Sequence, residues 1–264
     1  MKITGVSLVC YSPTGTSRKT LEGIAEGLGI KKVRRIDLTP PGAEAKAHNV
    51  PVGELAVFGV PVYGGRVPPD AARRLRAVKG GGTPAVVVTL YGNRAFEDAL
   101  VELSDIVREQ GFRTVAGAAF VGEHSFSNKV TPIAVGRPDA TDLAKARNFG
   151  EKVRAKLVST APSEVMVPGK RPYKDLSGLV LAQKAPLTRA DACTLCGDCA
   201  RVCPAGAVKV SDKVETDPAK CTACCACVKA CPTAARYWTH EGLLKAAAWL
   251  NKEFSARREP EFFL

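Results

Sequence analysis

One cysteine pattern, present twice near the C-terminus, constrains this chain more than any other feature. CTLCGDCARVCP spans 193–204 and CTACCACVKACP spans 221–232, and both read C-x-x-C-x-x-C-x-x-x-C-P. Each cysteine of the first copy has a counterpart 28 positions later. An iron–sulfur cubane needs this density of thiolates, because each of its four iron corners takes one cysteine. The pattern therefore predicts iron–sulfur clusters and one-electron chemistry.

Zinc and disulfides are the other common uses of eight such cysteines. A zinc site of two C-x-x-C pairs leaves no role for the third cysteine of each copy, or for the cysteine before proline. The segment 1–11 has one lysine and a short apolar run without a cleavage site, so we expect no secretory signal. We also expect no membrane span. These features favour the cytoplasm, where thiols stay reduced and available to iron.

The duplication and the proline after each fourth cysteine resemble the bacterial two-cluster ferredoxins over roughly 50 residues. In that family the fourth cysteine of each copy serves the other cluster. The resemblance implies two 4Fe-4S clusters, one held by Cys193, Cys196, Cys199 and Cys231, the other by Cys203, Cys221, Cys224 and Cys227. Cys225 departs from the pattern, since it stands where the first copy has Gly197. We interpret Cys225 as a small buried residue, with a substitute ligand or redox thiol as the alternative.

The first 160 residues alternate apolar runs with amphipathic stretches and are long enough for a domain with its own core. Strands are predicted at 3–11, 33–38, 55–62, 85–91 and 114–121, and helices at 17–28, 70–78, 95–110 and 139–158. Near-continuous Val and Ala runs are typical of strands buried on both faces. The alternation predicts an α/β fold, with a doubly wound five-stranded parallel sheet.

Ligands of such sheets bind at the carboxyl ends of the strands, where the strand order reverses. The loop after the first strand, SPTGTS, offers hydroxyls and amides at a helix N-terminus, which can hold a phosphate without a cation. It lacks the lysine of a Walker loop. The loops after the third and fourth strands each place a tyrosine beside glycine, where a flat ring could stack. Ordinary capping and turns are the alternative for each loop alone.

These three loops are similar to those of flavodoxin, a resemblance that covers roughly residues 1–160 and implies FMN. Phosphate binding would fall to Ser12, Thr14, Gly15, Thr16 and Ser17, and flavin binding to Pro61, Val62, Tyr63, Gly64, Gly65, Tyr91, Gly92 and Asn93. Flavodoxins usually place acidic residues beside the ring, whereas Arg66 and Arg94 occur here. A nearby cation stabilises the anionic hydroquinone, so we expect the two-electron reduction of this flavin to be easier than that of a flavodoxin.

Four segments are predicted: a flavodoxin-like domain at 1–160, a surface linker at 161–184, a two-cluster ferredoxin domain at 185–238 of small α+β type, and a helix with a tail at 239–264. The linker is rich in Pro, Gly and Lys. Thr239 could cap the helix, and the apolar tail could dock on the first domain or on a second subunit of a homodimer. His124, after the last strand, could donate a proton to the flavin with Glu123 orienting it.

The formal net charge of +12 favours an acidic redox partner, such as a soluble electron carrier or a reductase. No nucleic-acid motif accompanies this charge. The layout resembles prokaryotic iron–sulfur flavoproteins and implies an oxidoreductase that relays low-potential electrons between its clusters and FMN. Two alternatives stay open: a cluster-based redox sensor, and a flavin reductase that takes hydride from NAD(P)H.

Overall fold

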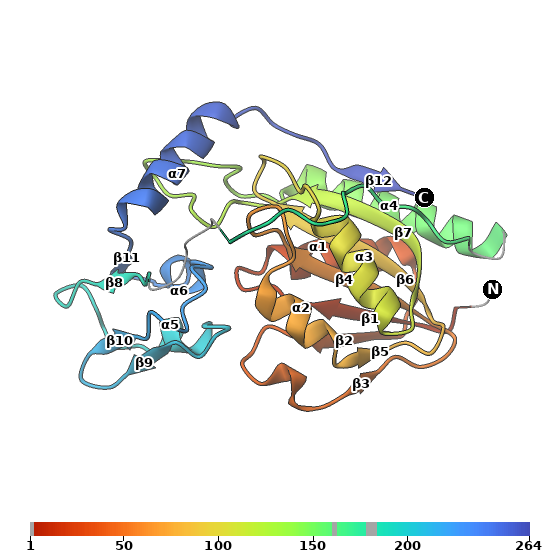
Figure 1. Cartoon of the computed structure of the whole chain (residues 1–264), viewed down its shortest axis with the longest axis horizontal. Helices are drawn as coiled ribbons and strands as arrows, with labels where there is room; N and C mark the ends of the chain where they lie inside the picture. Colours follow the sequence, from red (N-terminus) through yellow and green to blue (C-terminus); the bar gives the residue numbers. More distant parts are fainter. Residues whose placement is uncertain (1–2, 160–162, 178–183) are drawn as a thin grey trace.

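A computed structural model describes residues 3–159, 163–177 and 184–264, and its centre is a six-stranded sheet (Figure 1). Five of its strands are parallel: β1 (Gly5–Cys10), β2 (Val33–Asp37), β4 (Glu54–Pro61), β6 (Pro84–Tyr91) and β7 (Arg113–Val121). They stand in the order β2-β1-β4-β6-β7. Counted along the sheet this is 2-1-3-4-5, the flavodoxin-like order of doubly wound folds. The predicted parallel sheet is confirmed.

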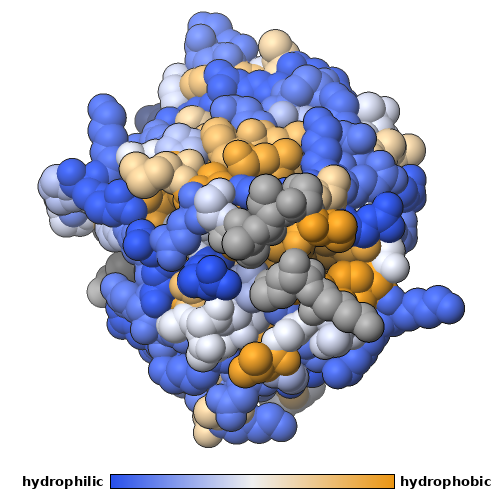
Figure 2. All heavy atoms as spheres, turned by 90° about the vertical axis from the view of Figure 1, so that its right-hand side faces the viewer, coloured by the Kyte–Doolittle hydropathy of each residue, from blue (hydrophilic) through white to orange (hydrophobic). Residues whose placement is uncertain are grey.

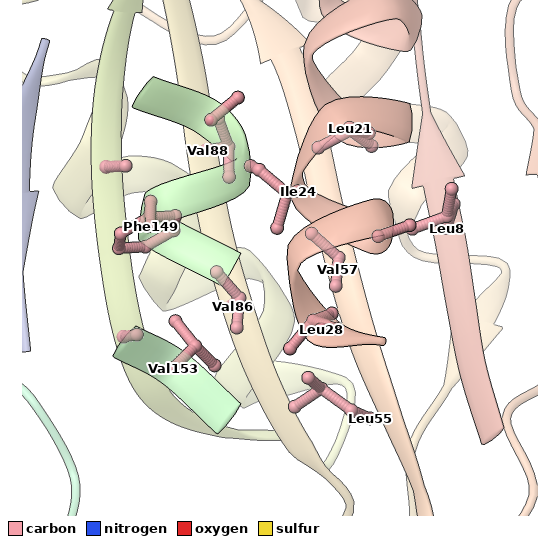
Figure 3. Packing of buried hydrophobic residues seen from close by; sticks show 14 of the residues in the cluster. Leu8, Leu21, Ile24, Leu28, Leu55, Val57, Val86, Val88, Phe149 and Val153 are labelled. Carbon is pink, nitrogen blue, oxygen red and sulfur yellow. The ribbon is translucent and has the colours of Figure 1, made fainter. Parts of the chain in front are cut away.

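Two helices cover each face of this sheet. One face carries α1 (Thr16–Leu28) and α4 (Ala140–Ser159), and the other carries α2 (Pro69–Leu75) and α3 (Ala99–Glu109). Figure 3 shows Ile24 and Leu28 of α1 meeting Phe149 and Val153 of α4 above the valines of the strands. β1, β4, β6 and β7 bury nearly every residue, because helices exclude water from both of their faces, whereas the edge strand β2 buries only Ile36.

Close approach of α1 and α4 depends on two glycines. A Cβ at Gly27 would lie 1.9 Å from the carbonyl oxygen of Arg147, and one at Gly150 would lie 2.2 Å from that of Ile24. Both neighbours are backbone atoms, which cannot move aside without shifting a helix. These positions therefore require glycine for packing rather than for flexibility.

The sixth strand comes from the C-terminal tail. β12 (Glu261–Phe263) pairs antiparallel with β7, and the ring of Phe262 contacts those of Phe120 and Phe149. Before it runs α7 (Glu241–Glu253), whose N-cap is His240 rather than the predicted Thr239. Nδ1 of His240 accepts a hydrogen bond from the amide of Leu243 at 3.3 Å. The tail thus docks on the sheet of its own chain.

Smaller elements complete the first domain. Two short strands, β3 (His48–Asn49) and β5 (Val78–Lys79), pair in parallel. A 3-10 turn at Ala43–Ala45 contacts α2. The predicted linker includes 161–162 and 178–183, which lie outside the described residues. Its described part runs along α3, where Asp98 accepts hydrogen bonds from the amides of Lys170 and Lys174. Arg171 also forms a two-bond ion pair with Asp105.

The cysteine-rich part is built from two similar halves. Its elements are β8 (Leu187–Thr188), α5 (Asp198–Arg201), β9 (Val208–Val210), β10 (Val214–Thr216), α6 (Ala226–Lys229) and β11 (Arg236–Tyr237). Positive φ angles recur 28 residues apart, at Leu195 and Ala223, at Gly197 and Cys225, and at Gly206 and Ala234. The sequence repeat is therefore also a repeat of backbone conformation.

The two ends of the molecule differ in character. The cysteine-rich part lies beyond the carboxyl ends of the parallel strands (Figure 1). Figure 2 looks onto the opposite end, where mostly hydrophilic side chains surround a smaller apolar area. Among the described helices, none has the length and apolar character needed to cross a membrane.

Candidate functional site

The cysteine-rich part is attached to the first domain by contacts at the carboxyl end of the sheet. Arg74 of α2 is 2% exposed and donates to the carbonyl oxygen of Pro204 at 2.7 Å, next to Cys203. Lys229 of α6 lies 2.6 Å from the carboxylate of Glu123, after β7. These bonds hold both cysteine copies beside the loops that were predicted to bind a flavin.

The loop between β1 and α1 has the features of a phosphate site. Gly15 caps α1 in the left-handed region, with φ 83°, and the hydroxyl of Ser12 accepts a hydrogen bond from the amide of Arg18 in the first turn. The first turn contains no acidic residue, so its partial positive charge is unopposed there. The hydroxyl of Ser17 is buried without a hydrogen-bond partner and belongs to a small cavity beside this turn. A phosphate with its ribityl chain would supply the missing partner.

A cavity of about 530 Å³ opens from the same loops. Its walls on the first domain include four predicted flavin-site residues, Tyr63, Gly64, Tyr91 and Gly92. The opposite walls come from two other parts of the chain. The second cysteine copy contributes Thr222 and Ala223, and α7 contributes Leu243, Ala246, Trp249 and Leu250. Two tyrosines and a mostly apolar lining suit a flat heteroaromatic ring.

The remaining predicted residues, apart from Gly15 and Asn93, line at least one of the two cavities. Ser12, Thr14, Thr16 and Pro61 line the small cavity, Gly65 lines the large one, and Val62 lines both. Gly65 has φ 92°, and a Cβ there would lie 1.9 Å from Oε2 of Glu97. The three loops therefore meet at the sheet edge, as the sequence indicated.

Charge around the large cavity differs from the prediction in one respect. Arg94 lines the cavity and pairs with Glu97 at 2.6 Å, while Lys174 pairs with the other oxygen of Glu97. Arg66 does not line it, because Glu102 binds its guanidinium with two hydrogen bonds. That Arg66 flanks the flavin stays a prediction, which the lining of this cavity does not support. Its partner Glu102 lies on α3, which the sequence pattern did not connect with this loop.

His124 lines both cavities, but its surroundings change its predicted role. Nδ1 accepts a hydrogen bond from the amide of Phe126 at 3.0 Å, which leaves the ring proton on Nε2. Burial, with Lys229 and Arg94 nearby, lowers the pKa of His124 to about 4. Near neutral pH the ring is uncharged. Its Nε2–H can donate a hydrogen bond, but the ring does not carry the additional proton of an imidazolium that it could transfer to a flavin. Glu123 does not orient it, since its carboxylate binds Lys229 and the amide of Gly136.

Asn93 has a different task from the one predicted. Its side-chain amide donates to the carbonyl oxygens of Phe254 and Ala256 at 2.6 and 2.8 Å. Its Oδ1 accepts from the amide of Arg258 at 3.3 Å. The side chain therefore fixes the segment after α7, and we assign it to positioning that helix rather than to flavin contact.

The eight motif cysteines form two groups of unequal exposure. Cys203, Cys221, Cys224 and Cys227 line one small cavity together with Ala207 and Val208, and the amide of Ala207 donates to Sγ of Cys203 at 3.2 Å. In the other group, Cys196 is exposed and Cys199 is buried, with Cys193 and Cys231 between these extremes. No disulfide joins any cysteine of the chain, all of which lie in described residues.

Within the described residues, no three Cys, His, Asp or Glu side chains converge as they would on a single metal ion. A cubane holds its cysteines on four separate iron corners, which requires a wider arrangement than one ion does. The shared cavity, the amide that donates to sulfur and the repeated loop conformation fit that requirement.

Sequence reasoning missed several residues of this site. Lys229 and Arg18 line two further hollows beside Thr14 and Gly15 and provide cations that the phosphate loop itself lacks. Buried Arg236 approaches Cys227, with 3.6 Å between its nitrogen and Sγ. α7 supplies an apolar wall of the large cavity. No local sequence signal connects these distant positions with the loops.

Comparisons with known proteins found one family model and several similar solved structures. Residues 185–233 match the family model of the 4Fe-4S dicluster domain. Similar solved structures include an archaeal flavodoxin, at 13% identity over 58% of this chain and 99% of the other, with a TM-score of 0.37. A flavodoxin of Streptococcus pneumonia TIGR4 has 16% identity over 57% and 98%, with a TM-score of 0.39.

A third structure, rubredoxin oxygen:oxidoreductase from the anaerobe Desulfovibrio gigas, has 13% identity over 59% of this chain and 36% of the other, with a TM-score of 0.39. No curated protein sequence matches the chain. From the strand order and the dicluster match, the chain joins a flavodoxin-like domain to a 4Fe-4S ferredoxin region.

Proposed function

We propose that the chain is an electron-transfer flavoprotein that relays electrons between two 4Fe-4S clusters and one FMN. The observation that carries this proposal is the wall shared by the two kinds of site. Thr222 lines both the large cavity and the cavity of Cys203, Cys221, Cys224 and Cys227. A flavin and a cluster in these places would be separated by little more than one residue.

The residues around the cavities have distinct tasks in this proposal. The loop Ser12, Thr14, Gly15, Thr16 and Ser17 holds the phosphate with amides and hydroxyls, and Arg18 and Lys229 add positive charge. Tyr63, Tyr91 and α7 enclose the ring and exclude water from it. His124 donates a hydrogen bond through Nε2. FMN, when bound, supplies the conversion between one-electron and two-electron transfer.

The external partner is proposed to be an acidic one-electron carrier, because the net charge of +12 would attract it. A reducing compartment such as the cytoplasm would keep the ten thiols free for iron. The described residues of the cavity lining offer hydrogen bonds and charge but no activated nucleophile. The chemistry is therefore assigned to the cofactors.

Anaerobic purification followed by iron, sulfide and flavin analysis tests the proposal. We expect eight iron, eight sulfide and one FMN per chain, as two cubanes and one flavin require. Cys224→Ala should lose iron while keeping FMN, and Gly15→Val should lose FMN while keeping iron. Absence of either cofactor from the unmodified protein would refute the relay. Rapid reduction by NAD(P)H, with slow reduction by one-electron donors, would favour a flavin reductase instead.

A further inference from the structure

We propose that the two cysteine sets act in a fixed order, an inference that rests on the proposed function. The set Cys203, Cys221, Cys224 and Cys227, here called the flavin-side set, exchanges electrons with the flavin. The set Cys193, Cys196, Cys199 and Cys231, here called the solvent-side set, receives them from a one-electron carrier outside the protein. Buried Arg236 makes this order energetically downhill.

The walls of the large cavity identify the flavin-side set. Thr222 and Ala223, which stand between Cys221 and Cys224, line that cavity. No residue from 193 to 203, all of them described, contributes to the same walls. The hydroxyl of Thr222 is buried without a hydrogen-bond partner, at the boundary between this cavity and the flavin-side cysteines. Because electron tunnelling slows steeply with distance, the cluster behind Thr222 is the one placed to reduce the flavin.

The solvent-side set is the more exposed of the two. Cys196 is exposed, and its neighbour Leu195 is 41% exposed. In the flavin-side set three cysteines are buried and Cys221 is intermediate. A carrier protein can therefore approach the solvent-side cluster closely, while the other cluster is covered by protein on the side of the first domain.

Arg236 makes its side-chain contact with the flavin-side set, and its charge also acts on Cys199 of the solvent-side set. It is 3% exposed, and one terminal nitrogen lies 3.6 Å from Sγ of Cys227. The hydroxyls of Thr188 and Thr216 hold its terminal nitrogens, and Nε has no partner. A fixed buried cation beside a thiolate stabilises the more negative, reduced cluster and raises its potential.

The solvent-side set has a weaker counterpart in Arg201. Its side chain is 72% exposed and pairs with Asp198 at 2.8 Å. Water, salt and the carboxylate screen this cation. The flavin-side cluster should therefore have the higher potential of the two.

Electrons balance in this order. The reduced carrier loses one electron to the solvent-side cluster and becomes oxidised, and that cluster is reoxidised when it reduces the flavin-side cluster. The flavin-side cluster then passes the electron to FMN. Two such rounds, with protons taken from water, complete the two-electron reduction of the flavin.

EPR-monitored redox titration of the unmodified, fully loaded protein tests the order, with dysprosium–EDTA as a soluble relaxing agent. The cluster that is reduced at the higher potential should show unchanged power saturation, because protein covers it. The cluster that is reduced at the lower potential should relax faster with the agent. The reverse assignment would overturn the order, even where iron and FMN contents support the relay itself.

Paired variants test the role of Arg236. Arg236→Met removes the buried cation at similar volume and should move the higher of the two cluster potentials to a more negative value. Arg201→Met, the matched control, removes the exposed cation and should leave that potential unchanged. Equal shifts in both variants, or none in Arg236→Met, would contradict the assignment. If Arg236→Met loses its clusters, the relaxation experiment on the unmodified protein still decides the order.

Discussion

The indole Nε1–H of Trp238 donates a hydrogen bond to the thiol of Cys225, with 3.2 Å between Nε1 and Sγ. Cys225 is 3% exposed and has φ 61°, a left-handed conformation that its counterpart Gly197 also adopts. A residue with a Cβ adopts this conformation at a cost of about 1–2 kcal/mol. The indole and the buried position offset that cost. These contacts favour packing as the role of Cys225, which lines the same small cavity as Cys203, Cys221, Cys224 and Cys227.

Replacing Cys225 should leave the iron content unchanged. Cys225→Gly removes both the conformational cost and the acceptor of Trp238, so we expect stability within about 1 kcal/mol of the original. Cys225→Ala keeps the cost and loses the acceptor, which should destabilise the fold by about 1–3 kcal/mol. Iron and sulfide analysis with thermal unfolding provides the check, and Cys224→Ala is the control that should lose iron. Loss of iron in Cys225→Gly would show that Cys225 is a ligand.

The attachment of the C-terminal tail depends on a buried ion pair. Arg137 and Asp142 share two hydrogen bonds of 2.6 and 2.8 Å, and their side chains are 5% and 0% exposed. Arg137 also donates to the carbonyl oxygen of Arg258 in the tail, and Arg257 donates to Asp142. Asp142→Asn should lower the free energy of unfolding by about 3–5 kcal/mol, because it leaves the buried guanidinium of Arg137 without its carboxylate, while Arg257 keeps Asp139 and Glu259.

A surface pair provides the control for Asp142→Asn. Glu26 and Arg147 lie 2.8 Å apart, but both side chains are more than half exposed. Glu26→Gln should therefore cost less than about 1 kcal/mol. Denaturant unfolding of both variants measures the difference. Equal effects would show that the buried position of Asp142 adds nothing.

Removing the side chain of Asn93 should weaken flavin binding from a distance. Asn93 has φ 67°, so Asn93→Gly removes its three hydrogen bonds to the tail without backbone strain. The segment after α7 then loses its anchor, and the α7 wall of the large cavity loosens. We expect FMN to bind more weakly by about 1–3 kcal/mol, as fluorescence titration would measure.

Limited proteolysis separates this explanation for Asn93 from a direct flavin contact. Cleavage after α7 should become faster in Asn93→Gly. Asn128→Ala, which removes an exposed asparagine with local bonds only, should change neither readout. Weaker FMN binding with an equally protected tail would mean that Asn93 contacts the flavin directly.

The sequence predicted the elements that depend on local pattern. All five parallel strands and the four helices around the sheet occur where apolar periodicity placed them, within a few residues at their ends. The carboxyl-edge rule brought the loops after β1, β4 and β6 together, and these loops do line the cavities. Residues that act through local backbone geometry, such as Gly15, were accessible to this reasoning.

Residues that act through distant contacts were not. Arg66 has a partner 36 positions away, and Asn93 binds a segment more than 160 positions away. Neither contact leaves a periodic signal in the sequence. Arg236 has the same difficulty, because only the folded hairpins bring it beside Cys227. The sequence alone therefore did not show how these three side chains are paired.

The pKa of His124, lowered to about 4, makes stability depend on pH. An unfolded histidine titrates near 6.5, so below that pH the unfolded chain takes up a proton that the native site refuses. The contribution of the uncharged ring to the free energy of unfolding is therefore fully present above pH 6.5 and decreases as the pH falls toward 4. Between pH 6.5 and 5.5 the loss should be about 1 kcal/mol. His124→Gln should remove this part of the decline.

Denaturant unfolding at pH 7.5, 6.5 and 5.5 measures the slope in both proteins. His48→Gln, which removes a histidine outside both cavities, should keep the original slope. The same series decides the role of His124 in the site, because an uncharged ring cannot serve as the proton reservoir for flavin reduction near neutral pH. An unchanged slope in His124→Gln would mean that the ring takes up a proton in the native protein over the same pH range as in the unfolded chain, and proton donation by His124 would then regain its basis.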